Sequence, residues 1–306
     1  MCGIVGYVGE REAQPILINC LKRLEYRGYD SCGIALQGNL VETHKDAVRI
    51  EALEATLSPS NSSIGIGHTR WATHGKPSRE NAHPHIDCSG KITVVHNGVI
   101  DNFLQLREQL SQEGHTFLSE TDTEVIPHLI EKYYQGNLEE AVSHALADMT
   151  GSYALIAFHV DLKQLVVARN GSPMIIGIGD KENFVASDVP AVLDYTDRVM
   201  YVEDGDLGVI TNNDIRFTKN GKPAEKAERR IPWTLEEAQK AGYEHFLLKE
   251  IHEQAKVIRN TFKGYISTLE PIVSLDIKRE IDFNILILAC GTSYHAALVG
   301  KHLIQE

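Results

Sequence analysis

The first half of the chain alternates between short apolar runs and amphipathic stretches. Residues 3–8 are apolar with two interspersed glycines, which is typical of a short buried strand. Between residues 12 and 25 the apolar positions recur every three or four residues, which predicts a helix with one buried face. The same reasoning predicts strands at 33–36, 64–68 and 91–96, and the last of them ends at Asn97-Gly98. It also predicts helices at 46–57, 102–113, 121–134 and 138–149. The helix at 121–134 has N-cap acceptors at 121–124.

The segment that follows is rich in short β-branched runs separated by turn residues. These runs predict six strands, at 153–159, 164–168, 175–178, 183–186, 199–202 and 207–211. Strands therefore follow strands, and the helices cluster between them. This order favours two packed antiparallel sheets flanked by helices, an α+β fold, over a regular alternation of strands and helices.

The pattern changes near the end of this segment. Residues 219–230 are charged and nearly devoid of large apolar side chains, which predicts a linker running to about Gly242. A strong amphipathic helix is predicted at 246–262. An apolar strand at 284–289, a turn at 290–293 and a helix to Ile304 then resemble the opening unit of an α/β domain. We therefore expect two domains, 1–238 and 239–306.

Composition narrows the classes of partner. The chain has 306 residues and a formal net charge of -12, which argues against nucleic acid and anionic membranes as partners. Its five cysteines form no C-x-x-C pair, so neither a disulfide framework nor a cysteine-rich zinc site is indicated. No apolar run is long enough to cross a bilayer. These features fit a protein of the reducing cytoplasm.

Cys2 is the first candidate for chemistry. Removal of Met1 would leave Cys2 with a thiol and a free α-amine on one residue. Their ordinary pKa values, about 8.5 and about 8, place both groups near neutrality. A nucleophile that uses its own terminal amine as the base is a known arrangement for acyl transfer. The alternative is that Cys2 is merely an apolar second residue.

Further residues match the other roles that hydrolysis of a side-chain amide requires. Asn97 and Gly98 can stabilise an oxyanion, although the pair is also typical of an ordinary turn. Arg70 can bind a carboxylate through two parallel hydrogen bonds, or can be a surface arginine. Asp122 can bind an ammonium group, or can simply open a helix. Trp71 can cover the pocket, or belong to the core.

Two other groups of residues suggest different sites. Five histidines that lie close together in sequence keep a zinc hydrolase open as an alternative, namely His68, His74, His83, His85 and His96. No H-E-x-x-H pattern accompanies them, so we expect no metal. Separately, Thr292 and Ser293 follow an apolar run at the start of a predicted helix, where backbone N–H groups can hold a phosphate.

Five ordered motifs together resemble one family. The chain is similar to the glutamine amidotransferases of the N-terminal-nucleophile class, and within them to the glutamine–fructose-6-phosphate aminotransferases (isomerising), also called glucosamine-6-phosphate synthases. Phosphoribosyl-pyrophosphate amidotransferases share less of the pattern and remain an alternative. The motifs are CGIVG from residue 2, LEYRGYDS from 24, HTRWATHG from 68, VHNG from 95 and ETDTE from 120.

The resemblance implies a four-layer αββα fold and a role for each candidate residue. Cys2 would attack the side-chain amide of L-glutamine, with Asn97 and the Gly98 N–H stabilising the oxyanion. Asp122 and the Gly98 carbonyl would bind the ammonium group of the substrate. No organic cofactor is implied. The α-carboxylate of glutamine would be bound by Arg70, Thr73 and His74, and Trp71 would gate the passage of ammonia.

The resemblance to this family also implies partners for the full-length enzyme. It transfers the ammonia to fructose 6-phosphate in a sugar-isomerase domain, and it is expected to be a homodimer. Thr292 and Ser293 would belong to an incomplete sugar-phosphate site, because the later isomerase residues are absent from these 306 residues. We therefore expect glutaminase activity alone from this chain. A catalytically silent module that kept the fold is the remaining alternative.

Overall fold

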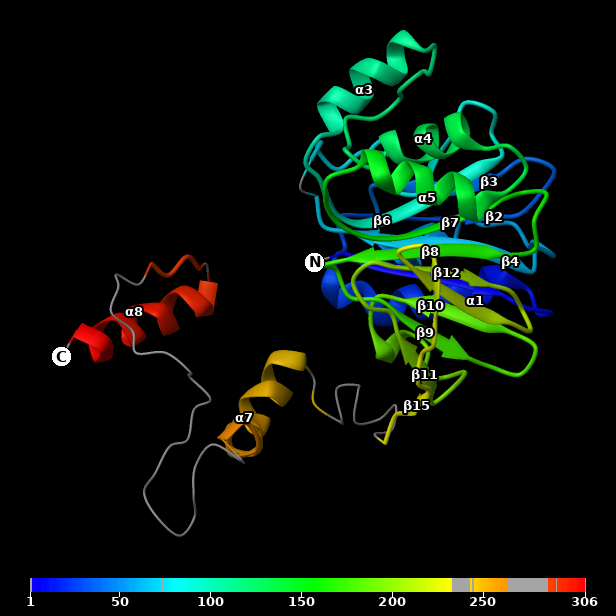
Figure 1. Cartoon of the computed structure of the whole chain (residues 1–306). Helices are drawn as coiled ribbons and strands as arrows, with labels where there is room; N and C mark the ends of the chain where they lie inside the picture. Colours follow the sequence, from blue (N-terminus) through cyan, green and yellow to red (C-terminus); the bar gives the residue numbers. More distant parts are fainter. Residues whose placement is uncertain are drawn as a thin grey trace. The chain divides into compact units, whose positions relative to one another are not determined.

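The structure, a computed structural model, divides the chain into two compact units, Met1–Gly242 and Tyr243–Glu306. It describes residues 2–72, 74–232, 243, 245–262, 286–289 and 291–305. The first unit contains both sheets and the helices that cover them (Figure 1). None of the helices in the described ranges is long and apolar enough to cross a membrane.

Two antiparallel sheets form the centre of the first unit. The eight-stranded sheet has the order β15-β11-β9-β10-β1-β4-β2-β3 and the seven-stranded sheet the order β14-β13-β12-β8-β7-β6-β5. The first sheet comprises β1 (Gly3–Val8), β2 (Ser31–Leu36), β3 (Glu42–Asp46), β4 (Ile64–Arg70), β9 (Ile175–Ile178), β10 (Asn183–Ala186), β11 (Arg198–Tyr201) and β15 (Arg229–Arg230). The second comprises β5 (His85–Ile86), β6 (Ile92–Ile100), β7 (Gly151–His159), β8 (Leu165–Asn170), β12 (Asp206–Ile210), β13 (Ile215–Lys219) and β14 (Lys222–Ala224).

Helices cover the outer face of each sheet, so that the unit has four layers in the order αββα. Side chains alternate across a strand, and in β1 Val5 and Tyr7 pack in the cluster under the helices while Ile4 and Val8 pack in the cluster between the sheets. The predicted four-layer α+β fold is confirmed. The helices are α1 (Ala13–Leu24) and α2 (Ile50–Glu54) on the first sheet, and α4 (Val125–Tyr133) and α5 (Leu138–Asp148) on the second, with α3 (Phe103–Gln112) beside α4.

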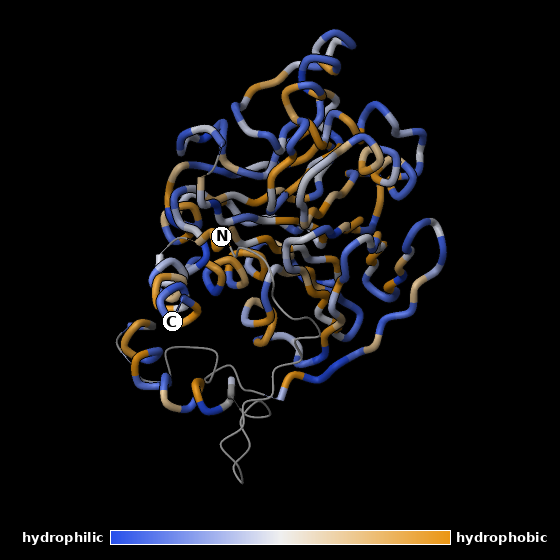
Figure 2. Tube along the Cα trace, turned by 60° about the vertical axis from the view of Figure 1, so that its left-hand side comes forward, coloured by the Kyte–Doolittle hydropathy of each residue, from blue (hydrophilic) through white to orange (hydrophobic). Residues whose placement is uncertain are grey.

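Hydropathy follows this layering. In Figure 2 the apolar segments run through the strands in the middle of the first unit, and hydrophilic segments form the loops at its edge. Three apolar clusters account for the pattern: one under α1, one under α4 and α5, and one between the two sheets. Burial of apolar area is the main favourable term in folding, so these three clusters hold the four layers together.

The second unit contains the helices α7 (Phe246–Phe262) and α8 (Gly291–Gln305). The strand predicted at 284–289 was wrong over its described part, because residues 286–289 have no strand structure and Leu286 and Leu288 are exposed. A strand needs a partner for its backbone N–H and C=O groups, and within the described ranges 286–289 pair with none. The assignment of this unit to a sugar isomerase stays a prediction.

Several elements of the first unit differ from the sequence-based expectation. The predicted helix at 46–57 is shortened to α2, and residues 42–46 pair with β2 as the edge strand β3, which takes residue 46 from the predicted helix. The helix predicted from residue 121 begins at Val125. Its expected N-cap acceptors are used elsewhere, since Asp122 accepts from the Ile100 N–H and Glu124 from the Ser119 N–H.

The linker predicted from residue 219 was also wrong at its start. Residues 222–224 and 229–230 form β14 and β15, which extend the two sheets at their edges. Between them the Lys226 ammonium lies 2.6 Å from the Asp206 carboxylate and 2.8 Å from Glu203. Edge strands carry polar side chains, so an apolar pattern does not reveal them.

The Lys226 contact yields a stability prediction. The side chain of Asp206 is fully buried, and Lys226→Ala removes its ion-pair partner and leaves it the Glu203 N–H as donor. Breaking a buried ion pair typically costs about 3–5 kcal/mol. We expect Lys226→Ala to lower the free energy of unfolding by about 3 kcal/mol in urea titrations, and the exposed Lys222→Ala to change it by less than about 0.5 kcal/mol. Equal effects of the two changes would place residue 226 in a linker after all.

Candidate functional site

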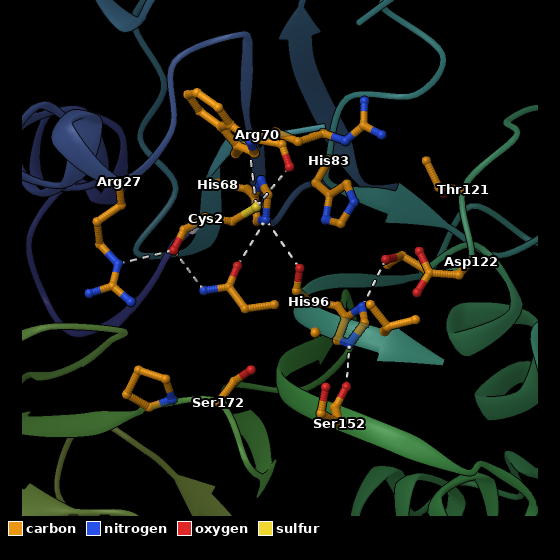
Figure 3. A pocket seen from close by; sticks show the side chains of 16 residues that line it. Cys2, Arg27, His68, Arg70, His83, His96, Thr121, Asp122, Ser152 and Ser172 are labelled. Carbon is orange, nitrogen blue, oxygen red and sulfur yellow. Dashed lines mark hydrogen bonds between the residues drawn. The ribbon is translucent and has the colours of Figure 1, made fainter. Parts of the chain in front are cut away.

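A cavity of about 320 Å³ opens at the ends of the central strands of both sheets. This volume lies at the lower end of the range for ligand sites, about 300–1,000 Å³. Figure 3 shows the lining side chains converging from β4, β6 and the segment before β1. Six residues that sequence analysis selected for amide hydrolysis line this cavity, namely Cys2, Arg70, Trp71, Asn97, Gly98 and Asp122.

Strand pairing places Cys2 at the cavity. β1 is held between β10 and β4, and Gly3 pairs with Thr69, so that Cys2 lies beside the segment that follows Arg70. The Trp71 N–H donates to the Cys2 Sγ at 3.2 Å, and Sγ lies 3.5 Å from the Trp71 carbonyl oxygen. The thiol is therefore oriented by backbone atoms rather than by a side chain.

The thiol needs a base before it can act as a nucleophile. Burial raises the pKa of the Cys2 thiol, and the Trp71 N–H and the Arg70 guanidinium only partly oppose this effect. At neutral pH the sulfur therefore carries its proton. Within the described ranges the hydrogen-bond partners of Sγ are the two Trp71 backbone atoms, so no histidine is bonded to it. A terminal amine on Cys2 would provide the missing base.

His68 fixes the orientation of the Asn97 amide. The His68 Nε2 lies 3.1 Å from both the Asn97 Oδ1 and the His96 carbonyl oxygen, and both are acceptors, so Nε2 carries the proton. Burial lowers the pKa of His68 to about 3, which keeps the ring neutral. Asn97 Nδ2 consequently faces Cys2 and donates to its carbonyl oxygen at 3.0 Å. Its second N–H is available for a ligand.

β6 runs through Asn97-Gly98 instead of ending there as predicted. Gly98 pairs with Tyr153 of β7 and has a φ of 141°, a conformation that favours glycine. A Cβ at this position would lie 2.0 Å from the Ser152 carbonyl oxygen. The strand can continue because residue 98 has no side chain, and the backbone of Gly98 therefore stays exposed to the cavity.

Arg70 is a buried cation with one unused donor. Only 3% of the residue is exposed, and its Nη2 donates to the carbonyl oxygens of His74 and, at 3.1 Å, Gly75. The buried Nη1 has no hydrogen-bond partner among the described residues. A buried donor without a partner is costly, so this nitrogen offers a binding position for an anionic ligand.

Asp122 supplies a buried negative charge to the same cavity. Its Oδ2 accepts from the Ile100 N–H at 2.9 Å, and its Oδ1 lies 4.0 Å from the His74 Nδ1. The carboxylate is 4% exposed, and Oδ1 keeps acceptor capacity for a ligand cation. Arg70 and Asp122 thus provide one site for each sign of charge.

Hydrogen bonds or ring stacking engage the other histidines in and beside the cavity. Burial holds the pKa values of His83 and His85 well below the ordinary range and lowers that of His96. His85 and His96 bond to the hydroxyls of threonines 121 and 123, at 3.0 and 2.8 Å, and His83 stacks on His68. In the described part of the chain, the cluster with metal-ligand spacing lies elsewhere and includes none of the five histidines.

Some candidates lie outside the cavity, and some residues that were not selected, Arg27 among them, line it. His74 is not part of the lining but contacts Arg70 and Asp122. Arg27 was not selected individually, although it lies in a quoted motif, and its Nε donates to the Cys2 carbonyl oxygen at 3.2 Å. Thr73 lies outside the described residues. Thr292 and Ser293 lie in the second unit, exposed in the first turn of α8.

Comparisons with known proteins agree with the motif analysis. Residues 68–194 match a family model described as a glutamine amidotransferase domain. The whole chain is 49% identical to the glutamine–fructose-6-phosphate aminotransferase (isomerizing) of Pyrococcus horikoshii and 48% identical to that of Aquifex aeolicus, covering 52% of each. The chain thus spans about half the length of the curated relatives it matches.

Over residues 68–194 the chain is therefore similar to a glutamine amidotransferase domain. A solved structure supports the fold: the glutamine phosphoribosylpyrophosphate amidotransferase from B. subtilis, complexed with ADP and GMP, is 28% identical with a TM-score of 0.62 over 71% of this chain and 49% of that chain. The family resemblance drawn from the five motifs is confirmed by these findings. The candidate residues of four of the motifs meet at one cavity of the first unit.

Gly98 gives a test of the site's architecture. We expect Gly98→Ala to lower the free energy of unfolding of the amidotransferase domain by about 3 kcal/mol or more, since it adds a clash with Ser152 to the cost of the positive φ. Gly136→Ala is the matched control: φ is 94° there and no atom lies within 4 Å of the added Cβ. The control should cost about 1–2 kcal/mol. Urea titrations that gave the two variants the same stability would contradict the clash at β7.

Proposed function

We propose that the cavity binds L-glutamine and that Cys2 hydrolyses its side-chain amide. The observation that carries this proposal is the arrangement of the lining. A thiol, an oriented amide donor, an unpartnered buried guanidinium nitrogen and a buried carboxylate all face one small space. Glutamine has a carboxylate, an ammonium group and an amide, and each of these groups has a counterpart among the four.

In the proposed mechanism the chain's own groups move every proton. The α-amine of Cys2, free after removal of Met1, takes the thiol proton as sulfur bonds to the amide carbon. The carbonyl electron pair moves to oxygen, which accepts hydrogen bonds from the second N–H of Asn97 and from the Gly98 N–H. The ammonium on Cys2 then protonates the leaving nitrogen, and the C–N bond breaks to release ammonia. Water attacks the thioester, releases glutamate and restores the thiol.

The two ends of the amino acid are proposed to bind to opposite charges. Arg70 Nη1 donates to the α-carboxylate, and the family resemblance adds Thr73 and His74 as further contacts of the same group. Asp122 Oδ1 and the Gly98 carbonyl oxygen accept from the α-ammonium group. Because Arg70 and Asp122 are both buried, each charge is weakly screened by water, which strengthens its pairing with the ligand.

The wider reaction is proposed from the names of the relatives. Glutamine–fructose-6-phosphate aminotransferases at 46–49% identity are named for transfer to a sugar phosphate, so fructose 6-phosphate is the proposed acceptor in the full-length protein. Trp71, which is half-exposed and packs edge-on against Tyr29, is proposed to gate the passage of ammonia. Thr292 and Ser293 are the proposed sugar-phosphate contacts. A cytoplasmic homodimer remains the prediction from sequence.

The alternative acceptor is phosphoribosyl pyrophosphate. The B. subtilis enzyme, which is named for phosphoribosyl pyrophosphate, shares the fold at 28% identity. The lower identity makes this the second choice. Supplying each acceptor to the full-length protein and analysing the amine product would separate the two.

Cys2 is the decisive residue for the proposed hydrolysis. We expect Cys2→Ala to abolish release of glutamate from glutamine while the circular dichroism spectrum is retained, because no other described thiol lines the cavity. Intact mass on the same active sample should show a chain that begins at Cys2. Full activity in protein that retains Met1 would exclude the terminal-amine mechanism.

Arg70 tests the recognition of the α-carboxylate. We expect Arg70→Lys to weaken binding of glutamine by about 2–4 kcal/mol, since one lysine ammonium cannot bind the His74 and Gly75 carbonyls and also donate at the position of Nη1. Steady-state kinetics should show this as a strongly raised KM for glutamine. Arg79→Lys, at an exposed position, is the control and should leave KM unchanged. An unaltered KM in Arg70→Lys would remove the carboxylate role.

A further inference from the structure

A second cluster of chemically reactive side chains lies away from the cavity. Cys88 follows β5, His115 lies between α3 and α4, and His128 and Glu131 lie on α4. One ligand atom of each residue lies within 4.8 Å of the others. None of the four lines the cavity of Cys2, so the cluster has no part in the proposed hydrolysis.

The spacing of the four atoms fits a tetrahedral ion. With Zn–S of about 2.3 Å and Zn–N or Zn–O of about 2.0–2.1 Å, a tetrahedron has ligand-to-ligand distances of roughly 3.3–3.6 Å. The Cys88 Sγ lies 3.5 Å from the His128 Nδ1 and 3.8 Å from the His115 Nδ1. The Glu131 Oε2 lies 3.0 Å and 3.6 Å from the same two nitrogens.

Backbone groups hold two of the four residues in place. The Thr116 N–H donates to the Cys88 Sγ at 3.4 Å, which is the kind of contact that stabilises a thiolate. The N–H groups of Cys88 and Ser89 each donate to Glu131, at 3.1 Å, one to each carboxylate oxygen. Such contacts around the ligands orient them before an ion binds.

We propose that Cys88, His115, His128 and Glu131 bind one Zn²⁺ ion in a structural site. A thiolate and two imidazoles select zinc over Ca²⁺ and Mg²⁺, which take oxygen ligands. Four protein ligands leave no open position for a substrate, so the ion acts as a cross-link rather than a catalyst. This proposal departs from the expectation of no metal, which rested on the histidines near Cys2.

The cross-link joins three segments that are distant in sequence. It ties the turn after β5 and the start of the segment 113–124 to α4. That segment carries Asp122, and Glu124 of the same segment accepts from the N–H groups of Leu118 and Ser119. Zinc would therefore hold in place the chain that leads to one wall of the cavity.

The competing account is a metal-free cluster in which protons take the place of the ion. The Cys88 S–H can bond to His128, and a His115 N–H can bond to Glu131, at the same distances. Both accounts give each of the four ligand atoms a partner, and in both the buried Nε2 of His128 has none among the described residues. They differ in whether the purified chain retains a stoichiometric ion and in which residues are needed for it.

Metal content separates the two accounts. The full 306-residue chain is incubated with equimolar ZnSO₄, desalted into metal-free buffer and analysed by inductively coupled plasma mass spectrometry. We expect about one zinc per chain, and at least a roughly fivefold loss in Cys88→Ser and His115→Gln. Two controls should retain the ion: Cys2→Ala, which removes the thiol in the cavity, and His144→Gln, which changes an exposed histidine on α5.

Cobalt and thermal unfolding provide readouts that do not depend on the variants folding well. The parent chain with Co²⁺ should show a thiolate-to-cobalt charge-transfer band and the visible bands of tetrahedral coordination. A strong chelator should lower its Tm by about 5 °C or more, and added zinc should restore it. Any of three results would overturn the proposal. The parent chain could hold less than about one-tenth of a zinc ion per chain, Cys88→Ser could retain as much zinc as the parent, or the Tm could be unchanged by the chelator.

Discussion

The structure of the first unit depends on the burial of β1 between β10 and β4. All six residues of β1 are buried, and the strand has no exposed edge. Gly3 permits this packing, since a Cβ there would lie 2.7 Å from the Thr69 hydroxyl and 2.8 Å from Leu24. Cys2 comes directly before this buried strand, so its position is set by the centre of a sheet although it lies at the start of the chain.

The core between the sheets then sets the geometry of the cavity. Cys2 and Arg70 come from the first sheet, while Asn97 and Gly98 belong to β6 of the second. Apolar side chains from both sheets pack into one cluster beneath them, including Ile4, Ile66 and Val95. Close packing makes such a core hard to compress or expand. The separation between the thiol and the oriented amide is therefore a property of the core.

Polar burial at the cavity works against stability and in favour of binding. His68 is fully buried, and Arg70 and Asp122 nearly so. Burial of polar groups costs free energy unless hydrogen bonds replace those lost to water. Strand backbone and neighbouring side chains satisfy most of these groups, but His68 Nδ1 and Arg70 Nη1 have no hydrogen-bond partner among the described residues. Such incomplete pairing is expected where a ligand completes the set.

Most of the fold and much of the candidate site could be predicted from sequence, because both depend on local patterns. Period-two and helical patterns located β1, α1 and most later elements, and the motifs brought Cys2, Arg70, Asn97 and Asp122 forward as one set. Local pattern failed at the polar edge strands β3, β14 and β15, whose pairing satisfies backbone groups without an apolar signature.

Tertiary structure alone decided the contacts between residues distant in sequence. Hydrogen-bond geometry, which follows from how the sheets pack, determined that His68 orients Asn97. The close approach of β7 determined that only glycine fits at residue 98 and that β6 continues through it. The cluster at Cys88 likewise depends on three separate segments meeting. Sequence specifies which groups are available, and packing determines which of them meet.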